Sequence, residues 1–171
     1  LSFTVTLPND VKPSLSSCLA SIDNSANEVV ADWGIAVAGF TSLNITANAS
    51  GAYGSTISRF VIEGTYSETI SSATLNYTGA VIQSSGEKAV TITCIDSRGR
   101  RSDSVSTNSI MFSAYSAPTI SSFTAEREKS NGVATGAVTL KAIFNYDSVG
   151  GKNTASALLH CKQSGSDAWN G

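Results

Sequence analysis

The stretch Pro13-Ser-Leu-Ser-Ser-Cys-Leu-Ala20 returns in altered form as Pro118-Thr-Ile-Ser-Ser-Phe-Thr-Ala125. An apolar triplet precedes each copy, Val5-Thr-Leu7 and Ile110-Met-Phe112, so residues 5–20 match residues 110–125 at one constant offset of 105 residues. An offset of this size is too long for a solenoid repeat and suits one small β domain. The sequence therefore predicts β domains that follow one another along the chain.

The repeat continues further along the chain with altered spacing. Leu43-Asn-Ile-Thr-Ala47 matches Val138-Thr-Leu-Lys-Ala142 at an offset of 95 residues, and residues 57–62 match residues 155–160 more weakly at an offset of 98. Loops absorb such changes in length because the entropy of loop closure grows slowly with length. The first block carries the inference, and these two matches support it.

The offset predicts three parts of the chain. Residues 1–9 would be the last strand of a preceding repeat, residues 10–114 one complete β-sandwich, and residues 115–171 the truncated first part of a following repeat. An incomplete repeat would expose unpaired strand edges, which tend to pair with another chain. We therefore expect a homodimer formed through exposed strand edges, or a poorly ordered C-terminal third.

Composition restricts the class of protein. Charged residues make up 14% of the chain and the net charge is −2, whereas a nucleic-acid binder normally presents a basic face. No apolar run approaches the roughly 18 residues of a membrane-spanning helix. We therefore expect neither a nucleic acid nor a membrane as a partner.

The apolar residues alternate with polar ones, which is typical of half-buried β-strands. The pair Ser16-Ser17 breaks the alternation by one residue, and Ser121-Ser122 does the same in the second copy, which predicts a β-bulge in both. Residues 33–40 contain two glycines and predict a short strand or an irregular loop. Further strands are expected at residues 3–7, 15–22, 43–50, 57–62, 74–77, 80–82, 89–95 and 102–112.

The sequence Asp96-Ser-Arg-Gly99 predicts a type I turn followed by a glycine bulge, because Asp suits the first position of such a turn and Gly the fourth. This turn would join residues 89–95 and 102–112 into one hairpin. No segment shows helical periodicity over three turns. About seven strands per unit and no helix predict an all-β protein built as a β-sandwich.

Cys18, Trp33 and Cys94 follow one another in the order found in immunoglobulin domains, where a tryptophan packs on a disulfide between the sheets. Two features argue against that disulfide here. Ile92 stands where such domains have a tyrosine, and Phe123 replaces Cys18 in the second copy. The bridge and a pair of buried thiols both remain open, and we favour the thiols, which suit assembly in a reducing cytoplasm. Cys161 has no evident partner.

Three motifs occur in a fixed order: Gly51-Ala-Tyr-Gly-Ser-Thr-Ile57, Ile95-Asp-Ser-Arg-Gly-Arg100 and the closing Tyr115-Ser-Ala-Pro118. Together with Pro13 and its Leu-Ser-Ser strand, this set resembles the immunoglobulin-like repeat in minor structural (tail) proteins of siphophages and prophages of Gram-positive bacteria. The resemblance covers roughly residues 10–130.

The resemblance implies an immunoglobulin-like (fibronectin type III-like) β-sandwich in a tandem array. It also implies a non-enzymatic spacer role in a phage tail, assembled in the bacterial cytoplasm, with neighbouring repeats and other tail proteins as partners. A contribution to host-surface contact would fit the same family. The alternative is a carbohydrate- or surface-binding adhesin module at the bacterial cell surface.

A surface-binding site would have to come from loops. Arg98, Arg100 and Arg101 cluster at the predicted hairpin tip and could meet phosphate or an acidic glycan of the host cell wall, although a charged tip also keeps a hairpin soluble. Tyr53 and Tyr66 could stack on sugars, although tyrosines in β domains are usually packing residues. The sequence does not show whether the loops at 51–56 and 96–101 lie at the same end of the sandwich.

No set of residues points to catalysis or to a metal. His160 is the single histidine, it has no nucleophile motif around it, and the repeat matches it to the strand residue Ile62. Three cysteines and one histidine lack the paired spacing of a zinc site. We therefore expect no catalytic residue, no metal and no cofactor.

Overall fold

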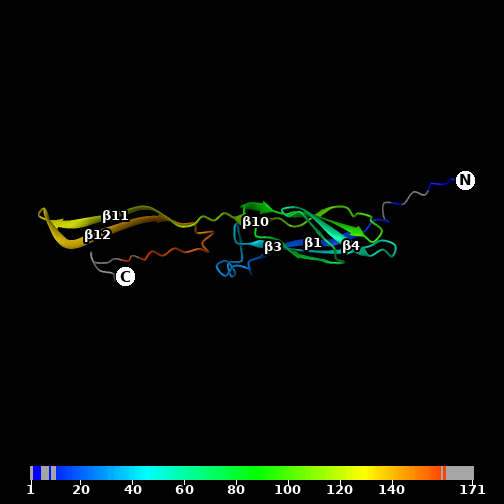
Figure 1. The fold of residues 1–171 in the computed structure, drawn as a ribbon, viewed down its shortest axis with the longest axis horizontal. Helices are drawn as coiled ribbons and strands as arrows, with labels where there is room; N and C mark the ends of the chain where they lie inside the picture. Colours follow the sequence, from blue (N-terminus) through cyan, green and yellow to red (C-terminus); the bar gives the residue numbers. More distant parts are fainter. Residues whose placement is uncertain (1, 5–7, 9–10, 159, 161–171) are drawn as a thin grey trace. The chain divides into compact units, whose positions relative to one another are not determined.

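A computed structural model describes residues 2–4, 8, 11–158 and 160. The chain divides into two compact units, Leu1–Ala114 and Tyr115–Gly171 (Figure 1). The described residues form strands and no α-helix. The strands are β1 (Ser14–Asp23), β2 (Ala36–Val37), β3 (Ser42–Ser50), β4 (Ile57–Gly64), β5 (Glu68–Ile70), β6 (Leu75–Thr78), β7 (Gly86–Lys88), β8 (Val90–Asp96), β9 (Val105–Ser106), β10 (Ile110–Ser113), β11 (Thr119–Ser130) and β12 (Val133–Asn145).

Two sheets of the first unit supply its core. One has the order β1-β3-β6 and the other β5-β4-β8-β9. Alternate side chains of β3, β4 and β8 belong to one cluster and are fully buried: Leu43, Ile45, Phe60, Ile62 and Ile92. The expected all-β class is confirmed, and the two sheets with a shared apolar core are consistent with a β-sandwich.

A third small sheet corrects the predicted hairpin. Residues 102–112 do not form one strand opposite residues 89–95, because within them the strand that pairs with β8 is the short β9. The chain then leaves that sheet, and β10 pairs with β7 and, in parallel, with β2. Phe112 of β10 is buried in the core.

Asn108 accounts for the change of sheet. Its side chain accepts a hydrogen bond from the backbone N–H of Ala20 at 2.8 Å and donates one to the carbonyl of Ala20 at 3.0 Å. Ala20 lies in β1, the edge strand of the opposite sheet. The side-chain amide thus bonds to Ala20 as a neighbouring strand would. The chain passes β1 at this point, where the alternation of apolar residues predicted one continuous strand.

Other predictions fare unevenly. The short strand within residues 33–40 is confirmed as β2. The strand expected at residues 80–82 is wrong. The backbone of Ile82 donates a hydrogen bond to the carbonyl of Thr41 and accepts one from the N–H of Gly39, and neither Thr41 nor Gly39 lies in a strand. Residues 5–7 of the expected first strand lie outside the described residues, and residues 2–4 are not in a strand. The assignment of residues 1–9 to a preceding repeat stays a prediction.

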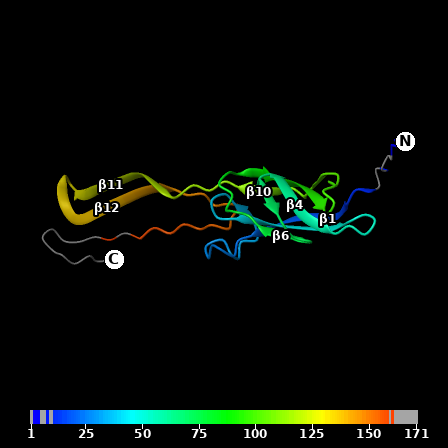
Figure 2. The same cartoon turned by 45° about the vertical axis from the view of Figure 1, so that its right-hand side comes forward.

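The second unit contains a long two-stranded ribbon of β11 and β12 (Figure 2). Both predicted β-bulges are present, between Leu15 and Ser17 in β1 and between Ile120 and Ser122 in β11. The sequence offsets of 105 and 95 residues also relate the strand pairs: every partner pair from Ser14–Ser50 to Ile22–Leu43 in β1 and β3 corresponds to a pair in β11 and β12. The two ribbons therefore share one register.

The weaker match at residues 155–160 does not extend to secondary structure. Residues 155–158 and 160 are not in a strand, whereas the matching segment of the first unit is β4. In the first unit, β4 is held between β5 and β8. No strand pairs with the described residues 155–158, so their backbone groups lack the partner strand that a β-ladder requires.

Candidate functional site

The two loops that the sequence could not place relative to each other meet at one end of the first unit. The loop at 51–56 joins β3 to β4, and the turn at 96–101 follows β8. Because β4 and β8 are antiparallel and Ile57 pairs with Asp96, the start of one strand lies beside the end of the other. Both loops therefore lie at the same end of the sheet, next to each other.

The turn has the predicted geometry. Gly99 donates its N–H to the carbonyl of Asp96 at 2.9 Å, and Asp96 donates its N–H to the carbonyl of Arg100 at 3.0 Å. Gly99 has φ +79°, the left-handed conformation that a glycine bulge requires. The Asp96 side chain also accepts the backbone N–H groups of Arg98 and Arg100, at 3.0 and 2.8 Å.

Asp96 and Arg100 form an ion pair at this end. The Arg100 guanidinium contacts the second carboxylate oxygen through Nε at 2.9 Å and through Nη2 at 2.6 Å. Burial acts to raise the pKa of Asp96, but hydrogen bonds from the backbone and side chain of Arg100, from Ser55 and from the Arg98 N–H outweigh it. The pKa of Asp96 falls to about 2, so the carboxylate stays charged at neutral pH.

The arginines hold the neighbouring loop. Arg100 Nη2 donates to the carbonyl of Ala52 at 3.2 Å and to Ser55 Oγ at 3.0 Å. Arg98 Nη2 donates to the carbonyl of Tyr53 at 2.9 Å. Both guanidinium groups are thus used for positioning the loop, a role that inspection of the sequence had not assigned to them.

Tyr53 stands at the tip of the loop that these arginines hold. Its side chain is 68% exposed, and its backbone has φ +50°, which is uncommon for a non-glycine residue. A surface hollow of ≈ 600 Å³ lies beside it and is lined by Pro8, Val11, Tyr53, Arg98 and Arg100. An aromatic ring and two cations at one concave surface could receive a sugar ring or an anionic group.

Not all predicted residues join this site. Arg101 is exposed and does not line the hollow. Its backbone forms an isolated antiparallel β-bridge with Ile95. Tyr66 is a packing residue: its hydroxyl accepts the N–H of Leu43 at 3.1 Å and donates to the carbonyl of Ala80 at 2.9 Å. Its ring meets Tyr77 edge-on, with centroids 5.8 Å apart.

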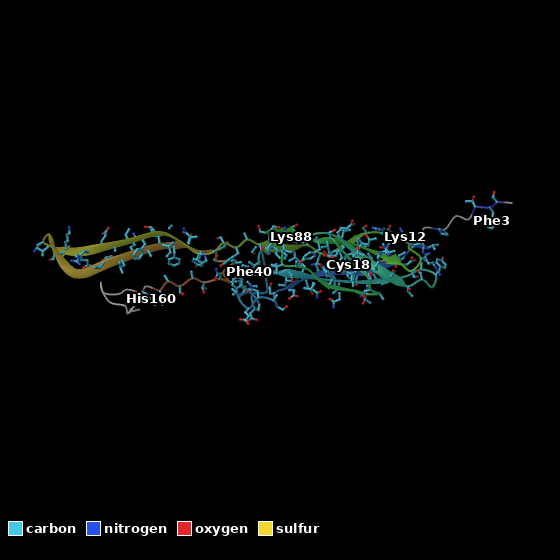
Figure 3. All side chains as sticks on the ribbon, viewed as in Figure 1. Phe3, Lys12, Cys18, Phe40, Lys88 and His160 are labelled. Carbon is cyan, nitrogen blue, oxygen red and sulfur yellow. The ribbon has the colours of Figure 1, made fainter. Side chains whose placement is uncertain are left out.

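Cys18 and Cys94 are free thiols, as favoured from the sequence. Cys18 lies among the strands of the first unit (Figure 3) and is partly buried, and Cys94 is fully buried. Burial raises the pKa of both thiols, and each is therefore a poor nucleophile at neutral pH. Cys161 lies outside the described residues.

His160 is exposed and not in a strand (Figure 3). Among the described residues, no group of three or more His, Cys, Asp or Glu side chains could hold a metal ion. The same residues contain no helix with the length and apolar character that a membrane crossing requires.

Comparison with known proteins gives one match. A family model described as "Siphovirus protein of unknown function (DUF859)" matches residues 1–157, which is most of the chain. No curated protein and no solved structure matches.

Proposed function

The chain belongs to this siphovirus protein family, and we propose that it is a non-enzymatic structural module of the phage tail. In this proposal residues 10–114 form an immunoglobulin-like β-sandwich and residues 115–171 begin another, in a tandem array. Its partners are the neighbouring repeats of the same chain and other tail proteins. Repeated β domains of this kind serve as spacers, because each one folds around its own core.

One observation carries the proposal. The ribbons β1–β3 and β11–β12 share their register and the position of their bulge, under the offsets that the sequence repeat gives independently. A one-residue change of register would turn every side chain to the opposite face. A register retained over eight residue pairs therefore supports two copies of one structural unit.

Labelling of virions would test the role and the location together. Antibodies raised against residues 10–114 should label the tails of intact siphovirus particles in electron micrographs. An in-frame deletion of the same residues should yield particles with altered or missing tails. Label on capsids, on cells alone, or on no particle would contradict the tail role, and label on cells alone would favour the adhesin alternative.

Host-surface contact is a second candidate function, favoured by the exposed Tyr53 beside the hollow that Arg98 and Arg100 also line. The test is a pull-down on Gram-positive cell walls with a matched pair of variants. Tyr53→Ala should abolish saturable binding, whereas Met111→Ala should retain it, because Met111 is 60% exposed on β10 and does not line that hollow. Absence of binding by the unaltered chain would leave the spacer role alone.

A further inference from the structure

The chain enters the first unit at the end that carries Tyr53. Ser14, the first residue of β1, pairs with Ser50 at the end of β3, so β1 begins beside the loop at 51–56. Pro8 and residues 11–13, here called the entry segment, precede β1 directly. A hydrogen bond from the N–H of Val11 to the carbonyl of Pro8, at 3.1 Å, joins the two described parts of this segment.

Lys12 anchors the entry segment by an ion pair. Its ammonium group contacts both carboxylate oxygens of Asp103, each at 2.6 Å. The two side chains are 40% and 80% exposed, and a pair this accessible adds little to the free energy of global unfolding. Its effect is local, because it ties the residue before Pro13 to a part of the chain 91 residues further along.

Apolar contacts accompany the ion pair. Pro13 is buried and Val11 is half-buried. The hollow of ≈ 600 Å³ beside Tyr53 takes one wall from the entry segment, Pro8 and Val11, and the rest from the two loops. Pro13 lines a second hollow, of ≈ 400 Å³, together with the first residues of the loop at 51–56. The entry segment therefore lies against this end of the unit.

The surface that receives the segment is itself held in place. Arg98 and Arg100 donate to the carbonyls of Tyr53 and Ala52, which fixes the loop at 51–56. The buried carboxylate of Asp96 in turn holds Arg100. A surface that is ordered in advance loses little conformational entropy when a segment docks on it.

The second copy of the entry segment lacks these anchors. Under the offset of 105 residues, residues 11–13 correspond to Ser116, Ala117 and Pro118. All three counterparts are exposed, whereas Pro13 is buried. Ala117 carries no charge with which to form an ion pair, and Ser116 offers less apolar surface than a valine. The repeat therefore retains the proline and not the contacts around it.

We propose that residues 51–56 and 96–103 form a seat for the entry segment, and that this seat makes the connection from the preceding repeat stiff. The existence of that repeat rests on the proposed tandem array. Pro8 and Pro13 each fix one backbone angle, and the anchors at Val11 and Lys12 hold the segment between them on the unit. The connection into the first unit is then stiff, and the connection into the second unit is flexible.

NMR relaxation of the backbone amides in the full chain tests the seat without any variant. The order parameters of Val11 and Lys12 should be about 0.85, as in rigid backbone, and those of Ser116 and Ala117 should fall below about 0.6. This comparison places the two copies of the segment side by side in one molecule. Low values at Val11 and Lys12 in the unaltered chain would overturn the proposal.

A matched pair of variants tests the anchors. Val11→Ser combined with Lys12→Ala gives the entry segment the residues of its second copy, and the order parameters of residues 11 and 12 should fall below about 0.6. Val29→Ser combined with Lys88→Ala is the control. It removes the same two kinds of side chain from the first unit, but Val29 is 65% exposed, Lys88 bonds to Ser84, and neither lines the two hollows. This control should leave the order of the entry segment unchanged.

Two further outcomes would overturn the proposal. An unchanged order parameter in the Val11 and Lys12 variant would show that the prolines alone order the segment. Tighter binding of this variant than of the unaltered chain to Gram-positive cell walls would show that the hollow receives an external ligand and that the segment only obstructs it. Each reading concerns the first unit alone, so a failure of the tail label would remove the preceding repeat and leave the result on the seat intact.

Discussion

Asp96 is a buried charged residue that stabilises one end of the first unit. It is fully buried, it caps the turn with its carboxylate, and it pairs with Arg100, which in turn holds the loop at 51–56. Its pKa is lowered to about 2 from an ordinary value of 3.8. A carboxyl with a lowered pKa stabilises the folded state fully above its unfolded pKa and loses that contribution as the pH falls towards its folded pKa.

We predict that the stability of the first unit falls as the pH drops from about 4 to about 2, and that Asp96 causes part of the fall. Urea unfolding at several pH values would measure it. Asp96→Asn should be less stable at neutral pH, because Arg100 loses its counter-charge, and should show a shallower fall. Asp103→Asn is the control, since Asp103 is 80% exposed in its ion pair with Lys12 and such pairs contribute little. An equally steep fall in Asp96→Asn would contradict the assignment.

Gly51 sets the path of the loop that carries Tyr53. A Cβ atom at this position would lie 2.0 Å from the carbonyl oxygen of Ser55. We predict that Gly51→Ala destabilises the first unit by about 1–3 kcal/mol, as overpacking does. Ser58→Ala, at an exposed position of β4, should change stability by less than about 0.5 kcal/mol. Denaturant unfolding would measure both, and equal effects would show that the loop yields without cost.

Single residues could be predicted where their chemistry acts locally. The Asp96–Gly99 turn follows from the preference of Asp and Gly for fixed turn positions, and its geometry is as predicted. Asn108 and Tyr66 could not be predicted, because their partners Ala20 and Leu43 lie far away in sequence. The arginines were predicted to cluster, but their role in holding the loop depends on the pairing of β4 with β8.

At the scale of elements, Asn108 ties the segment between β9 and β10 to β1 by bonding to both backbone groups of Ala20. We predict that Asn108→Ala costs about 1–3 kcal/mol, because it leaves buried backbone groups without partners. Hydrogen exchange of the Ala20 amide should become faster, and denaturant unfolding should show the loss. Ser109→Ala, at the exposed position next to it, should change neither quantity. An unaltered Ala20 amide in Asn108→Ala would show that β1 is held by β3 alone.

Strands could be predicted from the sequence where one face of the strand is buried and the other is exposed. The alternation at Leu43, Ile45 and Ala47 predicts β3, and the double serines predict the bulges of both ribbons. The hairpin expected at 89–95 and 102–112 is confirmed as far as β9 and wrong beyond it, because alternation cannot reveal which sheet a strand joins. The short strands β5 and β7 were not predicted, since three residues each are too few to show a period.

At the scale of the whole molecule, the two units differ in how they are stabilised. The large core cluster draws every one of its buried members from residues 20–112, within the first unit. The described part of the second unit is a two-stranded ribbon with its apolar face exposed. The sequence repeat relates the two ribbons but cannot show this difference, because burial depends on whether a second sheet packs against them.

The first unit should therefore fold and unfold without the second. We predict that a chain ending at Ala114 has the same urea midpoint as the full chain, because none of the described residues after 114 belongs to the core cluster. Circular dichroism would follow unfolding of both chains, and hydrogen exchange of β3 and β8 would show whether the same strands are protected. The full chain should add only a low-stability transition from the ribbon, since a two-stranded ribbon contributes little cooperativity of its own. A lower midpoint in the shortened chain, or loss of protection in β8, would mean that the ribbon stabilises the sandwich, and that the two units act as one cooperative body.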